Sequence, residues 1–81
     1  MDQTQALNKI QNIFRDITDT PNLSIDLTST PDTVPGWDSI ANVNIVFAIE
    51  EDFGVKFEVQ DLQKIKSVAD FLVILSNKTN H

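Results

Sequence analysis

The stretch PGWDSIANVNIVFAIEEDFG, residues 35–54, contains the longest helical pattern of the chain. Asp38 or Ser39 can cap the start of this helix, and Gly54 can end it in the left-handed conformation. Its apolar residues cover more than one face: Ile40, Val43, Ile45, Val46, Phe47, Ile49 and Phe53. We therefore expect a helix that packs against several neighbours or presents apolar surface to a partner.

Helical patterns also precede and follow this stretch. The first has one apolar stripe, formed by Leu7, Ile10, Phe14 and Ile17. Asp2 with Gln5 can form a capping box at its start, and Thr18 begins the turn-forming cluster that ends it. The last helix begins at Ser67, with Asp70 three residues further on, and we expect it to fray over residues 76–81.

The segments between these helices predict one long loop and one short helix. Residues 19–36 contain all three prolines, and four apolar side chains should fasten this loop to the core: Leu23, Ile25, Leu27 and Val34. Residues 55–59 alternate like a strand but have nothing to pair with, so we expect a loop leading into a short helix over residues 59–65. The fold class is therefore all-α: a four-helix bundle with three longer helices, a short third helix and a long first loop.

Length and composition exclude most catalytic classes. A chain of 81 residues makes one domain, residues 1–81, because it buries only roughly 60% of the surface that its unfolded form exposes. The chain has no cysteine, and its one histidine is His81 at the end of the chain. Disulfides, thiolate or histidine metal sites and a Ser-His pair are thereby excluded. We expect a carrier or binding module that is not an enzyme and holds no metal.

The charge indicates which partners to expect. The net charge is −6, and residues 38–53 contain four acids and no base. Such a surface repels nucleic acid and anionic membranes and attracts basic patches on proteins. The sequence shows no signal peptide, and its apolar runs are too short to span a bilayer. We therefore expect a cytoplasmic monomer that binds proteins, with no nucleic acid and no membrane insertion.

Ser39 is the candidate site residue because it lies at the start of the long helix. Unpaired backbone N–H groups and the positive end of the helix dipole favour a phosphate there. On position alone, capping by Asp38 or Ser39 is the simpler interpretation. The wider pattern favours a functional role over capping alone. It consists of Asp-Ser-Ile at a helix start, Val43, the apolar run 45–49, and then Glu-Glu-Asp-Phe. This pattern resembles the acyl carrier protein family, and the resemblance covers nearly the whole chain.

The resemblance implies a modified serine. Ser39 would receive 4'-phosphopantetheine from coenzyme A through a phosphopantetheinyl transferase, and the thiol of this arm would carry acyl groups as thioesters. Asp38 would assist the modifying enzyme, commonly through the metal ion that also binds coenzyme A. The enzymes that load and process the acyl group, in fatty-acid-like, polyketide-like or other specialised metabolism, would then meet this chain through basic docking patches.

The resemblance also implies a docking surface. Ile40, Val43 and Phe47 would form the face that meets partner enzymes, although core packing is an equal interpretation for Val43 and Phe47. Glu50 and Glu51, with Asp52, would meet Arg and Lys of the partners. Three acids near a helix C-terminus oppose its dipole at roughly 0.3 to 1 kcal/mol each, which favours a functional role for them.

Several features differ from the carriers of fatty-acid synthesis. Trp37 precedes Asp38, and we expect it to anchor the loop to the bundle. The residues that could surround an acyl chain are also the only core available: Ile49, Leu62, Ile65, Phe71, Ile74 and Leu75. Two alternatives remain open: an aminoacyl or peptidyl carrier, for example of the D-alanyl type, and an unmodified acidic helical adaptor.

Overall fold

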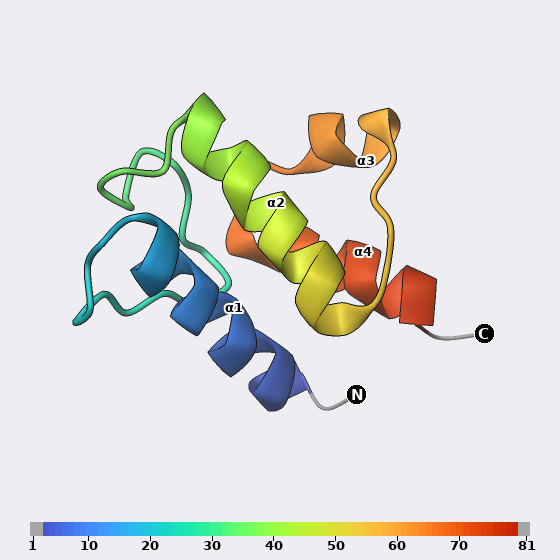
Figure 1. Cartoon of the computed structure of the whole chain (residues 1–81), viewed down its shortest axis with the longest axis horizontal. Coiled ribbons are helices and arrows are strands. Elements are labelled where there is room, and N and C mark those ends of the chain that lie inside the picture. The colour runs from blue at the N-terminus through green and yellow to red at the C-terminus, as the bar shows by residue number, and fades with distance from the viewer. Residues whose placement is uncertain (1–2, 80–81) are drawn as a thin grey trace.

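The computed structural model describes residues 3–79 and contains four helices and no strand in that range. The helices are α1 (Gln3–Ile17), α2 (Ser39–Phe53), α3 (Val59–Lys64) and α4 (Val68–Thr79), shown in Figure 1. The all-α prediction is confirmed, with a short third helix and a long loop between α1 and α2. The expectations for Asp2 and His81 concern residues outside the described range.

The core lies where α1, α2 and α4 meet. Figure 1 shows α1 and α2 side by side and running in opposite directions, with α4 behind α2. Every buried residue between positions 3 and 79 is apolar. The largest fully enclosed side chains are Phe14, Phe71, Ile10, Ile45, Ile49 and Val68. Ile74 and Leu75 are also buried, while Leu62 and Ile65 are half-buried against the core. The six residues expected to form the interior therefore serve as packing.

The first loop is fastened to the bundle by side chains and by its backbone. Ile25 and Val34 are buried and Leu23 is half-buried, as predicted. The prediction for Leu27 is wrong, because its side chain is 36% exposed. Leu27 contributes its carbonyl instead, which accepts the N–H of Ala69 at 3.2 Å. The loop thus provides acceptors for the first turn of α4, whose N–H groups have no partner inside the helix.

The last helix is longer than the sequence pattern suggests. Fraying from residue 76 is wrong for residues 76–79, because α4 continues to Thr79. Lys78 explains the difference: its Nζ lies 3.0 Å from Asp61 Oδ2 and 5.9 Å from the centroid of the Phe57 ring. The predicted start of α4 is confirmed, and the Asp70 carboxylate accepts the backbone N–H of Ser67 at 3.0 Å.

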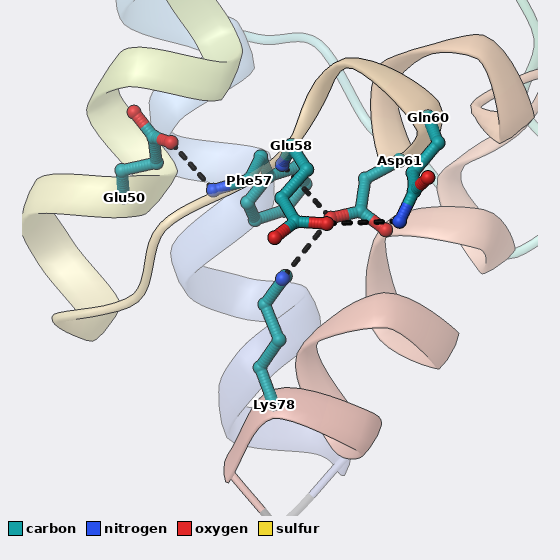
Figure 2. A network of polar contacts seen from close by, with 6 residues as sticks. All are labelled: Glu50, Phe57, Glu58, Gln60, Asp61 and Lys78. Atoms are coloured by element: carbon teal, nitrogen blue, oxygen red, sulfur yellow. Dashed lines mark hydrogen bonds and ion pairs between the residues drawn. The ribbon is translucent and has the colours of Figure 1, made fainter.

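The segment between α2 and α4 is held by Phe57, which is buried in the core, and by several polar contacts. Residues 55–58 form a loop, as predicted, and α3 has no buried residue. Figure 2 shows how this segment is attached: Glu50 Oε2 accepts the N–H of Phe57 at 2.6 Å, and Asp61 Oδ2 accepts the N–H of Glu58 at 2.9 Å. Asp61 then joins α3 to α4 through Lys78. None of the helices within residues 3–79 has the length and apolar character needed to cross a membrane.

Candidate functional site

Ser39 is the first residue of α2, and Asp38 caps the helix. Asp38 has an extended backbone with φ −109°, and its Oδ1 accepts the N–H of Ala41 at 2.8 Å. Its carbonyl accepts the N–H of Asn42 at 2.8 Å. The capping role of Asp38 is therefore confirmed. Because Asp38 provides the cap, the Ser39 side chain is not needed for it, and Ser39 is exposed.

A sharp turn before the helix places these residues at the surface. Gly36 has φ +86°, and a Cβ added there would lie 3.3 Å from Thr18 Cβ. A side chain at this position would thus be strained by its backbone and by contact with the end of α1. The close approach of Gly36 to Thr18 holds the turn against the bundle and leaves Ser39 on the outside.

Trp37 anchors the same turn in the core. Its side chain is 4% exposed, and its ring meets Phe14 edge-on with centroids 4.8 Å apart. It also stacks on Phe71 at 6.1 Å. The indole N–H donates to Asn42 Oδ1 at 3.0 Å. The predicted anchoring role is confirmed. Ser39 lies two positions after Trp37.

The chemistry of this helix start suits a phosphate ester. Within residues 3–79, the backbone N–H groups of Ser39 and Ile40 donate to no protein acceptor. These donors and the helix dipole favour a negative group beside an exposed hydroxyl. The side chain of Asp38 is occupied by capping, and in the part of the chain described no three His, Cys, Asp or Glu residues form a metal-binding group. This chemistry makes the Ser39 hydroxyl the candidate attachment point for a phosphate ester.

The three apolar residues that follow Ser39 lie on the surface. Ile40 is 76% exposed, Val43 47% and Phe47 62%. Their spacing of three and four residues places them on one face of α2. Of the two interpretations left open for Val43 and Phe47, core packing is therefore excluded. Together Ile40, Val43 and Phe47 form what we call the apolar stripe of α2.

The acidic residues at the end of α2 have different environments. Glu51 and Asp52 are exposed. Glu50 is half-buried, and its carboxylate accepts the N–H of Phe57. Its backbone carbonyl also accepts the N–H of Gly54, which has φ +67° as the predicted end of the helix. Glu50 therefore connects α2 to the following loop.

Two residues near this site were missed by the sequence interpretation. Asn42 accepts the indole N–H of Trp37. A partner of this kind could have been expected, because a buried Trp needs an acceptor for its N–H. Asp16 of α1 lines the same groove as Glu51 and Asp52 of α2. No local pattern indicates Asp16, because the groove forms only when α1 packs on α2.

Comparison with known proteins decides the family. The family model described as "Phosphopantetheine attachment site" matches residues 8–72, which is most of the chain and includes Ser39. The chain belongs to the acyl carrier protein family. The matched region includes most of α1, all of α2 and α3 and the first part of α4. Members of this family carry a covalently attached 4'-phosphopantetheine, and the helix start described above is compatible with that group.

Two relatives and one solved structure match nearly the whole chain. The chain is 30% identical over 79 residues to an acyl carrier protein of Thermosynechococcus vestitus, covering 96% of each chain. It is 32% identical over 82 residues to one of Petrotoga mobilis, covering 99% of this chain and 94% of that one. The solution structure of the holo acyl carrier protein from Geobacter metallireducens is similar with a TM-score of 0.82. That comparison has 26% identity and covers 91% of this chain and 85% of that one.

Proposed function

We propose that residues 1–81 act as a single carrier domain whose Ser39 hydroxyl bears the 4'-phosphopantetheine. The observation that supports this most is the exposed hydroxyl of Ser39 at the first residue of α2, in a chain of this family. When bound, the group supplies a terminal thiol on which cargo is held as a thioester. The chain itself has no cysteine that could take this role.

The residues around Ser39 position the attachment point. The Asp38 cap fixes the first turn of α2, and Trp37 fixes the turn that precedes it. The free N–H groups of Ser39 and Ile40 stabilise negative charge on an ester at Ser39. Asp38 is exposed as well as capping, so it remains accessible to the modifying enzyme. None of these tasks requires a catalytic residue of this chain.

The proposal assigns the apolar stripe of α2 to enzyme docking. An exposed Ile40 and Phe47 beside the attachment point form an apolar patch of the kind that marks interaction sites. We include Glu50 and Glu51 as acids that meet basic residues of the partners. The carboxylate of Glu50 already accepts the N–H of Phe57, so a partner would have to share it, whereas Glu51 is exposed and has no such contact. The main ionic contact therefore belongs to Glu51.

The cargo in this proposal is an acyl group of fatty-acid-like, polyketide-like or other specialised metabolism. The chain would receive its arm from coenzyme A through a phosphopantetheinyl transferase in the cytoplasm, and it would work as a monomer. Loading assays with acyl ligases and with amino-acid ligases test the cargo. Loading with an amino acid but not with an acyl group would favour the aminoacyl carrier over the acyl carrier.

The attachment is tested by intact mass. Incubation with coenzyme A and a broad-specificity phosphopantetheinyl transferase should add the mass of one 4'-phosphopantetheine to the wild-type chain, and Ser39→Ala should abolish the addition. Ser24→Ala, which alters an exposed serine of the first loop, serves as the matched control and should be modified like the wild type. Modification of Ser39→Ala would contradict the assignment. Full biological function of Ser39→Ala would favour the adaptor.

A further inference from the structure

Two hydrogen bonds of Asn42 span Ser39 at the start of α2. The indole N–H of Trp37 donates to Asn42 Oδ1 at 3.0 Å, and the backbone N–H of Asn42 donates to the carbonyl of Asp38 at 2.8 Å. Ser39 lies three positions before Asn42 and directly after these two partners. Asn42 is therefore bonded to both of the residues that precede the candidate attachment point.

The bond between Trp37 and Asn42 differs from the Asp38 cap, because it reaches the core. The cap joins Asp38 to the N–H of Ala41, so both of its partners belong to the start of α2. The Trp37 ring, in contrast, is 4% exposed and packs against phenylalanine rings of α1 and α4. Asn42 thereby connects the first turns of α2 to the buried rings of two other helices.

The burial of Trp37 makes this bond costly to lose. In the part of the chain described, no buried side-chain nitrogen or oxygen atom lacks a hydrogen-bond partner. Without the Asn42 oxygen, the indole N–H would stay buried with no acceptor, or the ring would have to move toward water. Any such movement displaces the backbone two residues before Ser39.

The position of the Ser39 hydroxyl depends on this short connection. The chain passes from the core at Trp37 to the surface at Asp38 and Ser39 within two residues. A rotation of this turn relative to α2 would therefore move the hydroxyl against the rest of the bundle. Transfer of a group between two bound molecules requires close alignment of the reacting atoms, so such a displacement lowers the rate.

We propose that Asn42 is a positioning residue for the modification of Ser39 and acts through its hydrogen bond to Trp37. The inference rests on the proposed function. In that transfer, Ser39 Oγ bonds to the phosphorus that carries the pantetheine of coenzyme A, and the pyrophosphate P–O bond breaks. The hydroxyl proton passes to a base of the transferase, and adenosine 3',5'-bisphosphate leaves. Asn42 takes no part in these bond changes and only holds the hydroxyl in place.

The indole N–H signal tests the hydrogen bond without any enzyme. Trp37 is the one tryptophan of the chain, so its NMR signal needs no further assignment. Asn42→Ala should speed hydrogen exchange of this N–H by about threefold to tenfold. Asn42→Asp keeps an acceptor oxygen and should restore the protection. The matched control is Asn44→Ala, which alters an exposed asparagine of α2 with no side-chain hydrogen bond in residues 3–79 and should change the exchange by less than about twofold.

Transferase kinetics test the positioning role. Initial rates of arm attachment are measured by intact mass at saturating coenzyme A and varied concentration of the 81-residue chain. Asn42→Ala should lower kcat/KM for the chain by about threefold to tenfold, mainly through a higher KM, because fewer molecules present the hydroxyl in the competent position. Asn44→Ala should match the wild type. A merely structural role would lower the urea midpoint and leave KM of the folded chain unchanged.

A double-mutant cycle shows whether Asn42 acts through Trp37. Trp37→Phe keeps an aromatic ring and removes the N–H donor, so it should lower kcat/KM as Asn42→Ala does. Adding Asn42→Ala to Trp37→Phe should then cost less than about twofold more. Fully additive losses would mean that Asn42 acts on the enzyme directly, and they would overturn the proposal. Amide spectra check that each variant is folded, and the comparison of Asn42→Ala with Asn44→Ala decides the question even if Trp37→Phe does not fold.

The outcomes separate this inference from the proposed function. No arm on the wild-type chain would overturn both. A modified wild type with an equal kcat/KM for Asn42→Ala, or with the same loss for Asn44→Ala, would overturn the role of Asn42 alone. Unchanged indole exchange in Asn42→Ala would also overturn it, since the hydrogen bond would then not hold the ring.

Discussion

Trp37 determines where the first loop meets the bundle. Its ring contacts Phe14 and Phe71, and its N–H reaches Asn42. Trp37→Ala should reduce the free energy of unfolding by about 3–5 kcal/mol, because it removes a large buried ring. This is a large part of the roughly 5–15 kcal/mol that stabilises a small domain. Urea unfolding followed by circular dichroism measures the change.

The matched control for this residue is Phe47→Ala. Phe47 is also aromatic, but it is 62% exposed in the apolar stripe. Its replacement should change the free energy of unfolding by no more than about 0.5 kcal/mol. Similar losses for both variants would mean that Trp37 does not hold the loop through its buried contacts.

At the scale of elements, Gly36 forms the turn before α2 and Gly54 ends α2. Gly54→Ala should cost about 1–2 kcal/mol, because φ is +67° and nothing lies within 4 Å of the added Cβ. Gly36→Ala should cost more, since φ is +86° and the added Cβ would lie 3.3 Å from Thr18. Gly54→Asn should be milder than Gly54→Ala, because Asn tolerates this conformation. Thermal unfolding of the three variants ranks these costs, and the reverse order of the two alanine variants would contradict the stated causes.

Both ends of α2 and the start of α4 were predictable because their signals are local. Asp38, Gly54 and the Ser67–Asp70 pair each act within a few residues of the boundary that they set. The end of α4 was not predictable in this way. It depends on Lys78 reaching Asp61, a contact that exists only after α3 and α4 have packed together. The exposed side chain of Leu27 has a similar cause, since the loop uses its backbone at that point.

In the candidate site, too, the features set by local sequence were predictable and those set by packing were not. Ser39, Asp38 and the apolar stripe belong to one continuous segment, so sequence spacing placed them correctly on one helix. In the sequence Glu50 cannot be distinguished from its neighbour Glu51. In the structure the loop after α2 folds back, and the N–H of Phe57 donates to the Glu50 carboxylate. The groove could not be predicted, because its two walls come from different helices.

At the scale of the whole molecule, the Asp61–Lys78 pair makes the attachment of α3 sensitive to acid. The N–H of Glu58, followed by the Lys78 side chain, lowers the pKa of the Asp61 carboxyl below its ordinary value of 3.8. The Thr28 hydroxyl and N–H similarly lower the pKa of Asp26 in the first loop. Carboxyls with a lowered pKa stabilise the folded state above pH 3.8, and this contribution is lost as the pH falls through the lowered value.

Asp61→Asn should therefore be less stable than the wild type at pH 7, and the difference should narrow as the pH falls below 3.8. Lys78→Gln should show the same trend more weakly, because the N–H of Glu58 remains in place. Urea unfolding at pH 7, 4 and 3 measures these differences. A constant difference between wild type and Asp61→Asn over this range would show that the carboxylate charge does not stabilise the fold.

The carbonyls of Leu27 and Ser29 that accept the N–H groups of Ala69 and Val68 have a consequence for biosynthesis. The loop acquires these donors only when α4 has left the ribosome, because about half of the chain separates each acceptor from its donor. Contacts of such long sequence separation slow folding relative to helical bundles with short connections. The segment that carries Ser39 should therefore reach its final geometry only after α4 has been synthesised, and the modification proposed for Ser39 should follow that step.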